Sequence, residues 1–362
     1  MSTIIVNASA LRTGGALTIY RQFIHHLPLY VRDHKYFIFV DPSVEQPVIE
    51  GVTYIEDGNH SNLHSICWSF FGLNRWLESN NITPDVIVSL QNIGTVTHCK
   101  QVIYYHQSLP FYKKSWSFLK SSERTMAAYK YIYPFFVKST LSANTDVVVQ
   151  IPFIKRGAVR RFKCNPDKVH VMFPDVEKID IEKIDAHEFE NGLFHFVYPA
   201  SSAPYKEHRT LVNAVAVLKS KNAALAERIR VHLTLREDVY PTLYKYIEEY
   251  NLCQQFVFDG GMPHEQLLTF YKGSCGLLFP STIETLGLPL LEAAAFGLPI
   301  IAVDLDYARE VMGDYEGVRF AGCYDYEKWA TEIERVCATP QKYRSLKPID
   351  SSWKDFFALI DK

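Results

Sequence analysis

Short apolar runs alternate with amphipathic stretches along almost the whole chain. In the first half, the apolar runs predict strands over 3–8, 36–40, 52–55, 85–89, 101–105, 145–150 and 168–172, and an amphipathic helix over 16–27. In the second half, the pattern predicts strands over 194–199, 230–234, 256–258, 276–279 and 300–303, and helices over 209–220, 242–250 and 267–273. This alternation is typical of doubly wound α/β domains built on parallel sheets.

The length of 362 residues and a hydrophobic content of 48% predict two domains of ordinary size. Residues 174–190 are acidic and poor in aromatic side chains, so we expect a linker there. The first domain then spans 1–173 and the second 191–349, and the strand over 168–172 is expected to lead from one to the other. An amphipathic tail over 351–360 predicts a last helix.

Seven scattered cysteines form no C-x-x-C pair, and the first residues run directly into a strand without a secretory leader. This usage favours a reducing compartment without a disulfide or metal scaffold, and hence the cytoplasm. No apolar run approaches the roughly 20 residues that a membrane-spanning helix needs. We therefore expect a soluble or peripheral protein.

The net charge of −2 hides an uneven distribution along the chain. Residues 101–170 contain twelve basic side chains against three acidic ones, and many aromatic residues are interspersed between positions 111 and 136. Basic residues around aromatic anchors are typical of a surface that binds anionic membranes. The same mixture is found in nucleic-acid-binding surfaces, and it also fits an ordinary helical region whose aromatic side chains lie in the core.

The segment 280–299, PSTIETLGLPLLEAAAFGLP, contains the most informative pattern. Glu284 and Glu292 flank a predicted loop-to-helix junction after the strand 276–279. Gly287 breaks the chain after the strand, and Pro289 suits the first turn of a helix. The helix ends at 296, before Gly297 and the proline at 299. Both carboxylates can then reach a ligand at the helix N-terminus, where free amides and the helix dipole favour a diphosphate. The alternative is that Ser281 and Glu284 form a capping box and that Glu292 is a solvated helix residue.

With the glycines and prolines at matching places, this segment resembles the Glu-x7-Glu signature of retaining glycosyltransferases that use nucleotide sugars (the group 1, or family 4, type found in bacterial surface polysaccharide synthesis). The resemblance is strong over 195–310 and weak over 1–170. It implies the GT-B fold, in which two Rossmann-like domains face each other across a cleft and the C-terminal helix, here within 350–362, packs back on the first domain.

The resemblance also implies roles for individual residues. Lys206, in a loop between a strand and a helix, matches the cation that holds the donor diphosphate, while Ser201 and Ser202 stand where an arginine is usual and Arg209 is a possible substitute. His106 matches a histidine that contacts the transferred sugar, with a backbone-bonded structural histidine as the alternative. Glu284 and His106 are the expected catalytic residues. The expected donor-binding residues are Ser201, Lys206, Gly261, Met262, Thr285, Leu286, Gly287, Leu288 and Glu292, and the expected acceptor-binding residues are Gly14 and Gly15.

The expected function is therefore metal-independent, retaining transfer of a hexose or deoxyhexose from a nucleotide sugar to an oligosaccharide acceptor, linked to polyprenyl diphosphate at the inner membrane face. No cofactor and no nucleic acid are expected. Asp304-Leu-Asp306 is interpreted as polarity at a strand end instead of a metal site. Two alternatives remain: a nucleotide-sugar epimerase of the same fold, and a non-catalytic sugar-nucleotide-binding subunit of another glycosyltransferase.

Overall fold

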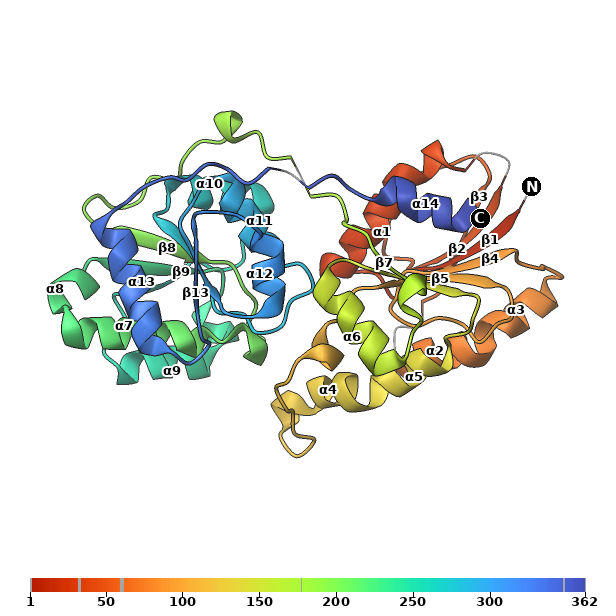
Figure 1. Cartoon of the computed structure of the whole chain (residues 1–362), viewed down its shortest axis with the longest axis horizontal. Coiled ribbons are helices and arrows are strands. Elements are labelled where there is room, and N and C mark those ends of the chain that lie inside the picture. The colour runs from red at the N-terminus through yellow and green to blue at the C-terminus, as the bar shows by residue number, and fades with distance from the viewer. Residues whose placement is uncertain (1, 32–33, 59–61, 177, 348, 362) are drawn as a thin grey trace. The chain divides into compact units, whose positions relative to one another are not determined.

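A computed structural model describes residues 2–31, 34–58, 62–176, 178–347 and 349–361 (Figure 1). Residue 177 of the predicted linker lies outside these ranges. The chain divides into two compact units, Met1–Val176 with Ile349–Lys362 and Glu177–Pro348. Within the described residues, no helix has both the length and the apolar character that crossing a bilayer requires.

The first unit is built on a seven-stranded parallel sheet in the order β3-β2-β1-β4-β5-β6-β7. Its strands are β1 (Thr3–Asn7), β2 (Lys35–Val40), β3 (Val52–Glu56), β4 (Val86–Ser89), β5 (Lys100–Tyr105), β6 (Thr145–Val149) and β7 (Val169–Val171). Its helices are α1 (Gly14–His26), α2 (Asn62–Cys67), α3 (Leu73–Ser79), α4 (Arg124–Ala127), α5 (Tyr133–Ser139) and α6 (Pro152–Phe162). The run 168–172, expected to lead to the second half, is the edge strand of this sheet.

Helix α14 (Trp353–Asp361) packs on the first unit, as the resemblance implied (Figure 1). Its apolar face joins the core formed by α1 and β1, β2, β4 and β5. Phe357 is fully buried and its ring stacks on Phe23 of α1, with centroids 5.2 Å apart. Burial of such large aromatic side chains stabilises the helix in place.

The second unit contains a six-stranded parallel sheet in the order β10-β9-β8-β11-β12-β13. Its strands are β8 (Phe194–Tyr198), β9 (Ile229–Leu233), β10 (Phe256–Phe258), β11 (Gly276–Phe279), β12 (Ile300–Val303) and β13 (Val318–Ala321). Its helices are α7 (His208–Lys221), α8 (Ala223–Ala226), α9 (Pro241–Glu249), α10 (His264–Gly273), α11 (Leu288–Ala295), α12 (Asp306–Met312) and α13 (Tyr326–Ala338). The prediction of α/β domains with parallel sheets is confirmed.

The predicted linker is divided between the two units: Asp175 bonds to Gln22 and His26 of α1, whereas the residues from 178 on are attached to the second unit. Lys272 of α10 donates to the carbonyl oxygens of Ile181 and Ile184 at 2.9 and 2.6 Å. The amide of His187 donates to the carbonyl of Thr269 at 3.0 Å. These bonds hold the segment along α10.

Candidate functional site

The strand order of the second unit places two chain segments side by side. From β8 the chain adds β9 and β10 on one side, whereas β11, β12 and β13 extend the sheet on the other. The carboxyl ends of β8 and β11 therefore form a topological switch point, where open α/β sheets bind ligands. Lys206 lies in the loop after β8, and Glu284 lies in the loop after β11.

Lys206 and Glu284 form an ion pair, with Nζ and Oε1 2.6 Å apart. Both side chains are mostly buried, with 16% and 15% of their surfaces exposed. The backbone amide of Thr282 donates to the carbonyl of Tyr205 at 2.8 Å, which ties the two loops together. The two residues that the resemblance singled out separately are thus one charged unit.

Helix α11 begins at Leu288, four residues after Glu284. Gly287, at its N-cap, has φ of 68° and ψ of 56°, a left-handed conformation that glycine adopts without steric cost. No side chain caps the helix and its first turn contains no acidic residue. Pro289 has no N–H, and the Leu290 amide donates to the carbonyl of Gly287 at 2.9 Å, which leaves Leu288 to offer an amide at this helix end. The predicted helix bounds of 289 and 296 are right to within one residue. The capping-box alternative is wrong, because Ser281 lies six residues before the N-cap.

Glu292 is held by two side chains of α10. Tyr271 donates its hydroxyl to Oε2 at 3.1 Å, and Nε2 of His264 lies 3.1 Å from Oε1. The Glu292 side chain is 13% exposed, so the alternative of a solvated helix residue is wrong. Sequence reasoning missed His264 and Tyr271; their one signal was the predicted α10 directly after the Gly261-Met262 loop.

The remaining expected donor residues differ in what they can offer a ligand. Gly261 is exposed, and a Cβ there would meet nothing within 4 Å, so its backbone is open to close approach. Ser201 is exposed, Met262 and Thr285 are half-buried, and Leu288 is 36% exposed. Leu286 is buried with 4% exposure, which leaves its backbone as the part able to bind a ligand.

Arg209 is engaged elsewhere on the same domain. It lies near the start of α7, and its guanidinium lies over the ring of Tyr246 of α9, 4.6 Å from the centroid. An exposed stacked arginine of this kind contributes a cation–π contact. It remains a prediction that Arg209 substitutes for the missing diphosphate-binding arginine.

In the first unit, Gly14 and Gly15 start α1 just after β1, beside the switch point between β1 and β4. Gly14 has φ of +61°, both glycines are exposed, and added Cβ atoms would meet nothing within 4 Å. The N-cap residue Thr13 makes no side-chain cap bond. The helix end is therefore open to close approach of a ligand, and the acceptor role of the two glycines stays a prediction.

His106 follows β5 and is fixed by the loop after β4. Its Nε2 lies 3.1 Å from the carbonyl oxygen of Leu90, and its backbone amide donates to the side chain of Asn92 at 2.6 Å. Burial lowers the pKa of His106 below its usual value, which favours the neutral ring. The bond to Leu90 is the one expected of a structural histidine, whereas a role towards sugar remains a prediction. Asn92 was not foreseen.

Among the described residues, no group of three or more His, Cys, Asp or Glu side chains could hold a metal ion. In the Asp304-x-Asp306 motif, Asp304 instead accepts two bonds from Arg309, at 2.6 and 2.9 Å. This bidentate pair accounts for the polarity at the end of β12.

The basic, aromatic region divides into core and surface. Phe111, Tyr112 and Trp116 are at most 8% exposed, as the core alternative predicts. Other large apolar side chains of the region are open to solvent: Phe118 (46%), Leu119 (91%), Tyr131 (41%), Ile132 (49%) and Phe135 (69%). We call this second set the apolar surface.

Comparisons with known proteins find similarity to the second unit in particular. Residues 180–350 match the family model of glycosyl transferases group 1. The O-antigen chain mannosyltransferase RfbU of Salmonella typhimurium is 23% identical over 240 residues, which are 66% of this chain and 62% of that protein. The chain thus spans less than two thirds of that relative's length.

Two solved structures share the fold of nearly the whole chain. WaaG, a glycosyltransferase of lipopolysaccharide biosynthesis, has 14% identity and a TM-score of 0.65 over 93% of this chain and 90% of its own. A UDP-GlcNAc 2-epimerase from Methanocaldococcus jannaschii has 12% identity and a TM-score of 0.55 over 99% of each chain. The fold alone therefore does not separate transferases from epimerases. Residues 180–350 match the glycosyl transferases group 1, in a chain with the GT-B fold.

Proposed function

We propose that this protein is a retaining, metal-independent glycosyltransferase of surface polysaccharide synthesis. It moves a hexose or deoxyhexose from a nucleotide-diphosphate sugar to an oligosaccharide acceptor linked to polyprenyl diphosphate. The observation that carries the proposal is the Lys206–Glu284 pair at the β8/β11 switch point, four residues before α11, whose N-terminus no side chain caps. The family match of this domain and the name of its mannosyltransferase relative support it.

In the proposed reaction, the bond between the anomeric carbon and the diphosphate oxygen breaks while an acceptor oxygen bonds to the same carbon. Lys206 and the amides of residues 286–288 take up the negative charge that grows on the departing diphosphate, as preorganised donors do in other enzymes. Glu284 holds hydroxyls of the transferred sugar, and Glu292 holds the ribose. The leaving phosphate accepts the acceptor proton, so that retention needs no nucleophile from the protein. Gly14, Gly15 and His106 serve the acceptor.

The test is a panel of UDP-, GDP- and dTDP-sugars with a lipid-linked acceptor in the presence of EDTA. We expect release of one nucleoside diphosphate, and its loss in Lys206→Ala and Glu284→Ala. Lys245→Ala and Glu249→Ala, which change exposed side chains of α9, serve as matched controls and should retain activity.

The same assay separates the alternatives. A label that stays on an epimerised nucleotide sugar and never reaches the acceptor indicates an epimerase, which the solved epimerase of similar fold keeps open. Donor binding without release, with every acceptor and with metal restored, indicates a non-catalytic subunit.

The proposal includes peripheral contact with the anionic inner face of the cell membrane. The apolar surface is accompanied by basic side chains of the same region, including Lys113, Lys120 and Arg124. Basic residues attract anionic lipid while exposed aromatic and aliphatic side chains enter the interface. A variant with Lys113, Lys114, Lys120 and Arg124 all changed to Glu should no longer sediment with anionic liposomes; if it still does, this contact is refuted.

A further inference from the structure

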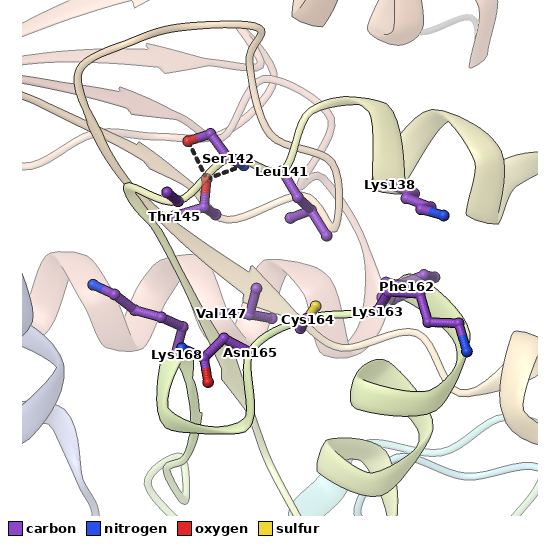
Figure 2. A pocket seen from close by; sticks show the side chains of 11 residues that line it. Lys138, Leu141, Ser142, Thr145, Val147, Phe162, Lys163, Cys164, Asn165 and Lys168 are labelled. Carbon is purple, nitrogen blue, oxygen red and sulfur yellow. Dashed lines mark hydrogen bonds between the residues drawn. The ribbon is translucent and has the colours of Figure 1, made fainter.

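A second basic feature of the first unit is a pocket of about 480 Å³ (Figure 2). It lies where α5 and α6 end and where β6 and β7 begin. In a parallel sheet the amino ends of the strands form the edge opposite to their carboxyl ends. Gly14 and His106 follow carboxyl ends, so the pocket belongs to a different site.

The lining combines an apolar floor with a cationic rim. Leu141, Val147 and Phe162 contribute the floor, and the lining residues include three lysines but no aspartate or glutamate. Figure 2 shows Lys138 and Lys163 at one end of the pocket and Lys168 at the other. Such a lining suits an anionic group that is joined to an apolar chain.

The three lysines of the lining differ in their surroundings. Lys168 is paired with Asp146 at 3.1 Å, and that carboxylate also contacts His170 at 2.8 Å. Two polar residues of the lining bond to each other: the Ser142 amide donates to the Thr145 hydroxyl at 3.0 Å (Figure 2). The exposed Lys138 and Lys163 are therefore the groups best placed to bind an anion.

The pocket continues the apolar surface. Phe135 and Lys138 are three residues apart in α5 and are therefore neighbours on its surface, and the exposed Ile132 ends the π-helical segment directly before this helix. The exposed Phe135 thus lies next to the lysine at the pocket rim. An amphiphile whose chain covers this face would bring its phosphate to the pocket.

We infer that this pocket binds the phosphate headgroup of an anionic phospholipid, whose acyl part lies against α5. The inference rests on the membrane contact in the proposed function and gives that contact a specific site. A simpler explanation is that Lys138 and Lys163 only complement the dipoles of the two helix ends, and it predicts no ligand.

The first experiment measures flotation of the whole protein with phosphatidylcholine vesicles that contain or lack phosphatidylglycerol. The doubly reversed variant Lys138→Glu/Lys163→Glu should lose binding to the anionic vesicles by roughly thirtyfold or more. The matched control Lys245→Glu/Lys347→Glu changes the net charge by the same amount at exposed positions of the second unit, and it should bind the vesicles as the wild type does. Equal losses of vesicle binding in both variants would show that the net charge of the protein alone explains the loss, and would overturn the inference.

A third variant, Ala143→Trp, fills the pocket from its exposed rim without changing charge. It should weaken the binding of monomeric dihexanoyl phosphatidylglycerol in calorimetry, and unchanged binding would refute the site. Glycerol phosphate and inorganic phosphate should bind much more weakly than the short-chain lipid; equal affinity would show a site for soluble phosphate instead. Donor turnover of each variant in detergent should remain that of the wild type. Lipid binding through the pocket without any donor turnover would leave this inference standing and remove the proposed function.

Discussion

The Lys206–Glu284 contact predicts energetic coupling between the loops after β8 and β11. The perturbation is a double-mutant cycle of Lys206→Met, Glu284→Gln and the double variant. At 2.6 Å and an effective dielectric constant near 20, the attraction between the charges is roughly 6 kcal/mol, and desolvation offsets most of it. Breaking a buried pair costs about 3–5 kcal/mol and breaking an exposed pair about 0–1 kcal/mol. With 16% and 15% exposure, we expect about 2 kcal/mol for each single change and a coupling energy of about 2 kcal/mol.

Hydrogen exchange of the amides in β8 and β11 is the suitable assay, because it reports the stability of this domain within a two-domain chain. Additive losses, with a coupling energy under about 0.3 kcal/mol, would refute the energetic link. The pair also predicts an effect on ligands, since a diphosphate must draw Lys206 away from Glu284. Glu284→Gln should therefore bind a free nucleoside diphosphate more tightly than the wild type in calorimetry while turnover falls. Glu249→Gln, on the exposed face of α9, should change neither quantity.

Three further predictions concern stability. Burial, followed by the charge of the neighbouring lysine, lowers the pKa of His208 to about 3, so the unfolded state binds a proton at a higher pH than the folded state does. The second domain should therefore lose on the order of 1.4 kcal/mol of stability for each pH unit below about 6.5. His208→Leu should flatten this loss, measured by hydrogen exchange of β8, and an unchanged pH dependence would contradict the role of this ring. Phe357→Ala should lower the free energy of unfolding of the first domain by about 3–5 kcal/mol, measured by urea unfolding with tryptophan fluorescence. Lys354 is exposed, so Lys354→Ala should change it by less than about 0.5 kcal/mol, and equal effects would contradict the packing of α14. Gly297 has φ of +67°, and a Cβ added there would lie 2.3 Å from a backbone oxygen, whereas Gly192 has φ of +82° and open space around it. Gly297→Ala should therefore lower the melting temperature more than Gly192→Ala, and the reverse order would contradict this geometry.

Local signals in the sequence determined much of the secondary structure. The bounds of α11 followed from Gly287, Pro289 and Gly297, because backbone conformations at a helix start and end restrict which residues fit there. The apolar runs located all but one of the strands, since strands buried on both faces are apolar throughout. The exception was β13 (Val318–Ala321), a mixed four-residue run with Arg319 inside it.

Helices were harder to recognise than strands. Helices α2 and α3 are joined by a π-helical segment, Trp68–Gly72, and α5 follows another, Ala128–Ile132. A π turn shifts the positions of side chains around the axis and so breaks the regular helical period. The helices α6, α12 and α13 were also not predicted from the chain alone.

The tertiary structure alone decided which residues meet. Lys206 and Glu284 are 78 residues apart, and they form a pair because β8 and β11 are neighbours in the sheet. Strand neighbours depend on packing between distant segments, to which no local pattern is sensitive. For the same reason the sequence could not show that Tyr271 and His264 hold Glu292, or which aromatic residues between 111 and 136 lie in the core. The sequence by itself determined which residues carry the candidate chemistry, and the fold decided their partners, because partners are chosen by contacts between segments far apart in the chain.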